Sequence, residues 1–176
     1  MDNNEHYYID CDIDESALCI DDSVFDDEDT RRFIALCEQA RQGDANAQFK
    51  LGEYWQCNYD IAEAVKWFHK AAEQGHADAQ YKLGFLYGIG WGANKDEVEA
   101  VKWYRKAAQQ GHAGAQLSLG HYYFYGRGVD KDEAEAEKWY LKAIEQGNSL
   151  AKRVFEGFNN LRSKSLNCNI KLNTLS

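Results

Sequence analysis

Residues 100–120 read AVKWYRKAAQQGHAGAQLSLG, and this stretch decides the fold because the chain repeats it. A close copy, AVKWFHKAAEQGHADAQYKLG, occupies residues 64–84, and a third copy begins at residue 136 as AEKWYLKAIEQGNSLAK. The copies are in register at an interval of 36 residues, as their tryptophans show: Trp67, Trp103 and Trp139. Self-similarity at a fixed period of this length predicts a solenoid built from stacked units.

Each unit is predicted to contain two helices. The first helix has the pattern AxAQxxLGxxY, as at residues 77–87. The second helix has the pattern DxxEAxKWYxKAxxQG, as at residues 96–111. An aspartate followed three residues later by a glutamate marks the start of the second helix, as in a capping box, and a glycine marks its end. The apolar positions of this helix recur every three or four residues and form a wide buried face: Ala100, Val101, Trp103, Tyr104, Ala107 and Ala108.

Each end of the solenoid is predicted to carry a single helix. RRFIALCEQARQGD, at residues 31–44, aligns with the second helix of a unit that has no first helix. NSLAKRVFEGFNNLR, at residues 148–162, matches a last first-type helix, and its polar outer face suits the end of a solenoid. The chain is therefore divided into an N-terminal segment at 1–29, a solenoid at 30–162 and a C-terminal tail at 163–176.

The first unit is shorter than the other two. Eight positions separate Gly52 from Asp60, whereas twelve separate the equivalent Gly84 from Asp96. Four residues, equivalent to about one helical turn, are therefore missing around residues 56–59.

The acidic residues are concentrated at the N-terminus. The whole chain has a net charge of −9, but residues 1–29 hold twelve acids and no lysine or arginine. The remainder has 17 acids against 20 basic residues and no basic stripe, so we expect no nucleic-acid partner. The acidic segment also contains apolar residues such as Tyr7, Ile13 and Phe25. We expect it either to be disordered or to dock on the solenoid.

The composition indicates a soluble protein of the cytoplasm. No apolar run approaches the roughly 18 residues of a membrane span, so no membrane insertion is expected. The first ten residues, MDNNEHYYID, lack the basic and apolar regions of a secretory signal. A monomer or a weak dimer is expected. The five cysteines do not recur with the units, which favours free thiols in a reducing compartment: Cys11, Cys19, Cys37, Cys57 and Cys168.

These motifs resemble those of the Sel1-like repeat family, whose units are slightly longer relatives of the tetratricopeptide repeat. The resemblance rests on AxAQYKLGFLY, GxGW, GRGV, KDExEAxKWYxKAA and QGHA, and it covers residues 30–160. It implies an all-α fold, an α/α superhelix of antiparallel helix pairs. The resemblance also implies binding of proteins or peptides, and we expect a scaffold or adaptor without catalysis. Some members are immunity proteins for secreted bacterial toxins, and an immunity protein is therefore the main alternative.

The first helices of such pairs line a concave face, and their variable positions are the candidates for binding a protein or peptide partner. Exposed aromatic residues with a few charges suit a groove for a peptide. The alternative is that aromatic positions such as Tyr54 and Tyr122 belong to the core between units. The candidate groove residues are Phe49, Lys50, Glu53, Tyr54, Tyr81, Lys82, Phe85, Leu117, His121 and Tyr122.

No motif predicts a cofactor or a metal. Asp10, Asp12 and Asp14 resemble part of a calcium loop, but Glu15 stands where that loop requires glycine. A solvated acidic segment is the better interpretation of these residues.

The histidines do not predict a zinc site or a catalytic centre. His76 and His112 recur with the units beside the glycine that ends a helix, which marks them as structural. His69 and His121 have no cysteine or carboxylate at the spacing of metal ligands. An enzyme with its active site in the groove would have only Glu53, His121 and the cysteines as candidates, without a defined pair of nucleophile and base.

Overall fold

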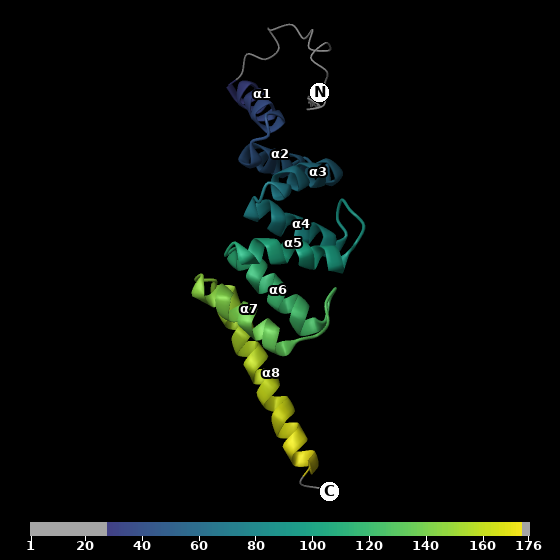
Figure 1. Ribbon diagram of the computed structural model, residues 1–176, viewed down its shortest axis with the longest axis vertical. Helices are drawn as coiled ribbons and strands as arrows, with labels where there is room; N and C mark the ends of the chain where they lie inside the picture. Colours follow the sequence, from purple (N-terminus) through teal and green to yellow (C-terminus); the bar gives the residue numbers. More distant parts are fainter. Residues whose placement is uncertain (1–27, 174–176) are drawn as a thin grey trace, which may run out of the picture.

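Helices account for all the regular secondary structure in the computed structural model, which describes residues 28–173 (Figure 1). Six of these helices have 13 residues each, or between three and four turns. The prediction of an all-α fold is confirmed. In chain order the helices are α1 (Glu28–Arg41), α2 (Ala45–Cys57), α3 (Ile61–Glu73), α4 (Ala77–Ile89), α5 (Glu97–Gln109), α6 (Ala113–Tyr125), α7 (Glu133–Glu145) and α8 (Ser149–Asn173).

The helices form a linear stack. Each one packs mainly on the helices next to it in the sequence, and the stack runs along the long axis from α1 to α8 (Figure 1). Packing is most extensive within the pairs α2–α3, α4–α5 and α6–α7, which are the three predicted units. The predicted solenoid of helix pairs with a single helix at each end is therefore confirmed.

The two end helices show how far the solenoid extends. α1 corresponds to the second helix of a unit and is as long as the later ones. It is followed by Gly43, which has a φ of 95°, just as a glycine follows each later second helix. α8 begins where the last helix is predicted. It continues past residue 162 to Asn173, into the predicted tail, and reaches beyond the other helices (Figure 1). Of the predicted acidic segment, only residues 28–29 belong to the described residues, where they begin α1.

Aspartate caps fix the start of each second helix, as predicted. The side chains of Asp60, Asp96 and Asp132 accept hydrogen bonds from the backbone N–H three residues on, at 2.9–3.0 Å. Each cap satisfies one of the N–H groups that a helix start leaves without a partner. The glutamates that donate these N–H groups pair through their side chains with lysines: Glu63 with Lys66, Glu99 with Lys102 and Glu135 with Lys138.

Close packing inside each unit depends on a glycine in the first helix. A Cβ placed on Gly84 would lie 2.7 Å from Cδ1 of Tyr104, which is closer than side-chain atoms approach one another. The absence of a side chain therefore lets the two helices of the unit come together. The same contact between glycine and ring occurs in all three units: Gly52 with Phe68, Gly84 with Tyr104 and Gly120 with Tyr140.

The tryptophans of the repeat belong to the core. Trp67, Trp103 and Trp139 are 3%, 5% and 8% exposed. The ring of Trp103 lies edge-on to the imidazole of His69 in α3, with centroids 5.5 Å apart, so it packs between consecutive second helices. A lysine three residues on places its ammonium group over each indole ring, at 3.9–4.3 Å from the centroid.

Buried glutamines connect consecutive units. Gln80 is 4% exposed, and its Nε2 donates to the carbonyl of Ala72 in the preceding second helix. Nε2 of Gln110 donates to Oε1 of Gln80 at 2.8 Å. Both groups of this buried amide therefore have partners, as is usual inside proteins, and the side chain joins two units. The bond to the preceding carbonyl recurs in the other units: Gln48 to Ala40 and Gln116 to Ala108.

The four residues missing from the first unit are missing from its loop, not from a helix. α2 is as long as α4, but only residues 58–60 connect α2 to α3, whereas residues 90–96 connect α4 to α5. Tyr59 in the short loop has a φ of 64° and is 87% exposed. This left-handed conformation costs a residue with a side chain about 1–2 kcal/mol. In the longer loop a glycine, Gly90, adopts it with a φ of 72°.

Candidate functional site

Two predicted groove residues support the start of the next unit. Phe49 and Tyr81 are half-buried and stack on the imidazoles of His76 and His112, with centroids 4.6 and 4.5 Å apart. These imidazoles are the N-caps of α4 and α6, because their Nδ1 atoms accept the backbone N–H three residues on. The structural role predicted for the two recurring histidines is therefore confirmed.

Leu117 and Tyr122 are core residues, and the prediction that they face a groove is wrong for both. Leu117 is 6% exposed and packs in a cluster with Ala136 and Tyr140. Tyr122 is 9% exposed, and its ring lies 5.4 Å from that of Tyr104. Both side chains point between helices, where burial of a large apolar group stabilises the stack. For Tyr122, the alternative interpretation as core between units is the correct one.

The other predicted residues lie at or near the surface of the first helices. Lys82 is half-buried, and its Nζ donates to Oε1 of Gln56 at 3.0 Å, which joins α4 to α2. The ring of Tyr54 packs on Phe33 of α1 with centroids 4.4 Å apart, although 41% of Tyr54 is exposed. Four of the predicted residues are exposed: Lys50, Glu53, Tyr54 and Phe85.

Exposed apolar side chains gather on α4 and α6. Phe85 and Ile89 of α4 are 40% and 51% exposed, and Tyr125, the counterpart of Ile89 one unit on, is 63% exposed. His121, the counterpart of Phe85, lies beside Tyr125 with ring centroids 6.4 Å apart. We call the three exposed side chains, together with the half-buried imidazole of His121, the apolar strip. Exposed apolar side chains that cluster on neighbouring elements indicate a binding surface.

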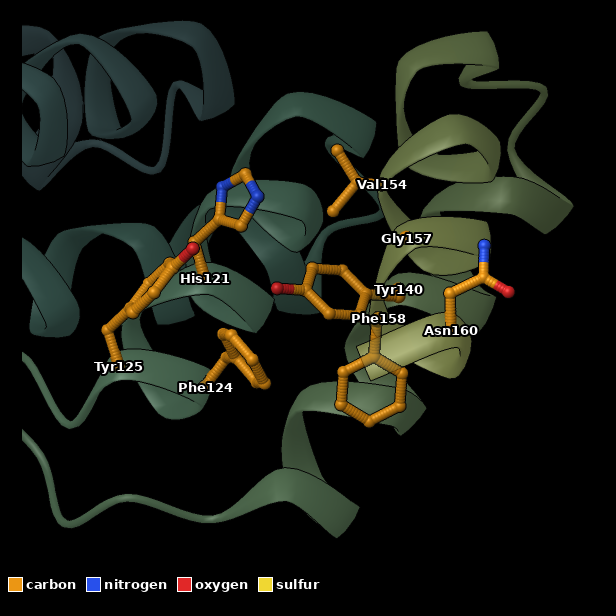
Figure 2. Close-up of a pocket in the computed structure, with 8 residues that line it drawn as sticks. All are labelled: His121, Phe124, Tyr125, Tyr140, Val154, Gly157, Phe158 and Asn160. Carbon is orange, nitrogen blue, oxygen red and sulfur yellow. The ribbon is translucent and has the colours of Figure 1, made fainter. Parts of the chain in front are cut away.

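A pocket lies at the end of the apolar strip, between α6, α7 and α8. Its volume is about 440 Å³, within the usual range of about 300–1,000 Å³ for ligand sites. We call it the α6–α8 pocket. Most of its wall is aromatic, and its polar groups belong to a few side chains (Figure 2). The lining residues are His121, Phe124, Tyr125, Tyr140, Val154, Gly157, Phe158 and Asn160.

The histidine and the buried tyrosine of the pocket are neutral at physiological pH. Burial lowers the pKa of His121, and the positive charge of Arg127 lowers it further. Burial raises the pKa of Tyr140, with a smaller contribution from Tyr125. The pocket therefore offers an imidazole with one donor and one acceptor, and a phenolic hydroxyl that can donate. Figure 2 shows this hydroxyl directed toward the side lined by His121 and Tyr125.

Sequence reasoning identified His121 but missed the other seven residues of the pocket. A signal was present in the alignment of the units, because Gly157 occupies the position held by Glu53, Phe85 and His121. A Cβ on Gly157 would meet nothing within 4 Å, so no close contact requires a glycine there. A glycine inside a helix lowers helix stability, so one that no close contact requires is notable. Here it leaves an opening in the row of side chains at this position of successive units.

Other kinds of site can be assessed only for the part of the chain that the structure describes. There, no cluster of three or more His, Cys, Asp or Glu side chains could hold a metal ion. Within residues 28–173, none of the helices is both long and apolar enough to cross a bilayer. Cys37 is buried and Cys57 is exposed, and these two form no disulfide.

Comparison with known proteins agrees with this architecture. A model of the Sel1 repeat matches three consecutive segments, residues 45–76, 77–112 and 113–148. No relative was found among curated proteins. Among solved structures, a Sel1 repeat protein from Oxalobacter formigenes is 40% identical, with a TM-score of 0.68. The match covers 72% of this chain and 98% of that protein.

Two further solved structures are similar. The protein c5321, a protective antigen of uropathogenic Escherichia coli with an SLR fold, is 34% identical with a TM-score of 0.53, over 68% of this chain and 34% of that one. Cysteine rich protein B of Helicobacter pylori is 25% identical with a TM-score of 0.55, over 69% of this chain and 96% of that one. The three matched segments begin with α2, α4 and α6, the first helices of the three units. The chain therefore belongs to the Sel1 repeat family.

Proposed function

We propose that this Sel1 repeat protein is a non-catalytic scaffold or adaptor, which binds an extended segment of a partner protein along its first helices. The observation that carries the proposal is the apolar strip. Its four side chains occupy two equivalent positions in successive units, so they offer apolar contacts at intervals along the stack. A peptide that lies across the units can place apolar anchors on such contacts, while Lys50 and Glu53 supply a polar edge on α2.

The chemistry of this face supports a role without catalysis. Nucleophilic catalysis requires a nucleophile and a base within hydrogen-bond reach. Among the described residues none forms a hydrogen bond with His121, and Glu53 lies two units away on α2. An immunity protein would be a specialised case of the same proposal, with a bacterial toxin as the partner.

Selection from a random peptide library tests the proposal without knowledge of the natural partner. Peptides selected on the full-length protein should lose at least about tenfold in affinity for the double variant Phe85→Ser/Ile89→Ser, because apolar anchors carry most of the binding energy. The matched control is Val98→Ser/Leu141→Ser. It removes side chains that are 53% and 41% exposed from the second helices α5 and α7.

The control variant should bind the selected peptides as tightly as the wild type. Peptides that bind both double variants equally well would contradict the proposal, since their site would lie away from the strip. Thermal melting followed by circular dichroism checks that each variant folds. All four replaced side chains are exposed, so only small shifts in melting temperature are expected.

A further inference from the structure

The hydroxyl of Tyr140 faces the α6–α8 pocket and has no hydrogen-bond partner among the described residues (Figure 2). Tyr140 is 1% exposed, and none of the described residues forms a hydrogen bond with it. In the preceding unit burial raises the pKa of the equivalent Tyr104, and the nearby hydroxyl of Ser118 of α6 opposes the rise. The residue one unit on from Ser118 is Val154 of α8, which cannot form this bond. The hydroxyl of Tyr140 is therefore free to donate to a molecule in the pocket.

Gly157 leaves part of the wall of the same pocket open. In the two preceding units the same position carries the side chains of Phe85 and His121. At Gly157 a Cβ would meet nothing within 4 Å, in contrast to Gly120, which lies against the ring of Tyr140. A large side chain is thus replaced by open space in the wall of the pocket.

The walls and the nearby charges define the ligand that fits. The guanidinium of Arg127 lies 5.7 Å from the ring centroid of Tyr125. The ammonium of Lys131 lies 5.6 Å from the ring centroid of Phe124, but it pairs with Glu133 at 2.8 Å. None of the eight lining residues is acidic. A flat ring suits the aromatic walls, and an anionic oxygen suits both the guanidinium of Arg127 and the free hydroxyl donor. The rings of the wall belong to His121, Phe124, Tyr125, Tyr140 and Phe158.

We propose that the α6–α8 pocket is a binding site for an aromatic carboxylate. The ring of the ligand lies between the aromatic walls, and its carboxylate accepts a hydrogen bond from the hydroxyl of Tyr140 in the field of Arg127. Two sources supply this chemistry: a free aromatic acid, or the last residue of a protein chain that ends in Phe, Tyr or Trp. The site goes beyond the proposed scaffold function and does not rest on it.

Isothermal titration calorimetry of the full-length protein with phenylacetate tests the site. We expect saturable binding that Tyr140→Phe weakens about tenfold, because one hydrogen bond to a charged group is lost. Tyr104→Phe is the matched control. It removes the same hydroxyl one unit earlier, where Ser118 is the partner, and should leave the affinity unchanged.

Two variants alter the pocket without removing Tyr140. Gly157→Leu fills the open space and should abolish binding. Val154→Ser restores the arrangement of Tyr104 and Ser118, so the new hydroxyl competes for Tyr140 and should weaken binding several-fold. Circular dichroism monitors folding. Because Gly157 has open space around it and lies inside a helix, its replacement should not lower the melting temperature.

Three further probes test the chemistry of the ligand. Benzylamine has a similar ring and the opposite charge, and should bind at least about tenfold more weakly than phenylacetate. A short peptide that ends in phenylalanine is compared as its free acid and as its C-terminal amide. A peptide acid that binds more tightly than both its amide and phenylacetate identifies a chain terminus as the ligand. If phenylacetate binds more tightly than the peptide acid, the ligand is a free aromatic acid.

Several results would overturn the proposal. They are the absence of saturable binding of both acids at millimolar concentration, equal affinity for benzylamine and phenylacetate, and unchanged affinity in Tyr140→Phe or Gly157→Leu. The peptide-library experiment relies on Phe85 and Ile89, which do not line the pocket. The two proposals can therefore fail independently.

Discussion

Gly84 lies so close to the ring of Tyr104 that a methyl group on the glycine would be 2.7 Å from Cδ1 of the ring. Overpacking of this kind costs about 1–3 kcal/mol. Alanine favours a helix by up to about 1 kcal/mol over glycine, which offsets only part of that cost. We therefore expect Gly84→Ala to lower the free energy of unfolding, measured by chemical denaturation followed by circular dichroism.

Gly157→Ala is the comparison for this prediction. Its Cβ meets nothing within 4 Å, so helix propensity alone should act and raise the free energy of unfolding by about 1 kcal/mol. We expect the free energy of unfolding to fall in Gly84→Ala and to rise in Gly157→Ala. A gain in stability at both positions would contradict the close packing inside the unit.

Replacement of Trp103 tests the tryptophan core. The side chain is 5% exposed, and Trp103→Ala should lower the free energy of unfolding by about 3–5 kcal/mol. Trp91 in the loop at residues 90–96 is 44% exposed and serves as the control. Trp91→Ala should cost less than about 1 kcal/mol. Similar losses in the two variants would show that the assignment of core and surface tryptophans is wrong.

The short loop of the first unit offers a stabilising substitution. Tyr59 has a φ of 64°, which glycine adopts without the steric cost borne by a side chain, and its own side chain is 87% exposed. Tyr59→Gly should raise the free energy of unfolding by about 1 kcal/mol. Asn58 has a φ of −88°, so Asn58→Gly should bring no gain. Comparison of the melting temperatures of the two variants distinguishes relief of backbone strain at Tyr59 from a general effect of glycine in this loop.

The stability of the protein should fall on mild acidification because of His69. Burial lowers the pKa of His69 from its usual 6.5, although Glu73 and Glu99 act in the opposite direction. The unfolded chain then binds the proton more tightly than the folded protein. The free energy of unfolding is therefore highest above pH 6.5 and decreases as the pH falls through 6.5 toward the lowered pKa.

A glutamine at this position provides the test. His69→Gln keeps a polar group opposite the hydroxyl of Tyr87, to which Nε2 of His69 lies at 2.8 Å, but it does not titrate. The loss of melting temperature between about pH 7.5 and 5.5 should be smaller in the variant than in the wild type. Burial also lowers the pKa of His121, so part of the loss should persist. Identical pH profiles would exclude a contribution from His69.

The fold could be predicted from the sequence because the same physical requirement recurs in each unit. Gly84 and Trp103 have counterparts at a fixed interval, and a recurring residue reports a contact that every unit must make. His76 and His112 were assigned a structural role on the same ground, and both cap a helix. Recurrence identifies core and caps, but it contains no information about a surface that differs between units.

The candidate site was harder to predict because it depends on which variable positions are covered by neighbours. Leu117 and Tyr122 vary between units, as surface residues do, yet neighbouring helices bury them. The pocket forms where the repetition ends, since Val154 and Gly157 of α8 break the pattern of α6. Its depth is a property of three packed helices, and no single stretch of sequence encodes it.

The extent of α8 is a further case in which a local signal was misleading. The polar residues after 162 suggested a tail, but polarity alone does not end a helix. The chain has no proline at all and no glycine after Gly157, so nothing in this region interrupts the hydrogen bonds of the backbone. The helix continues to Asn173.

The linear order of the helices has a consequence for how the chain reaches its native state. Because each helix packs mainly on its neighbours in sequence, most native contacts join residues that are never far apart along the chain. Bringing them together requires the closure of only short loops, so the entropy lost before the first contacts form is small. Folding can therefore begin in any of the three units and spread to the units beside it.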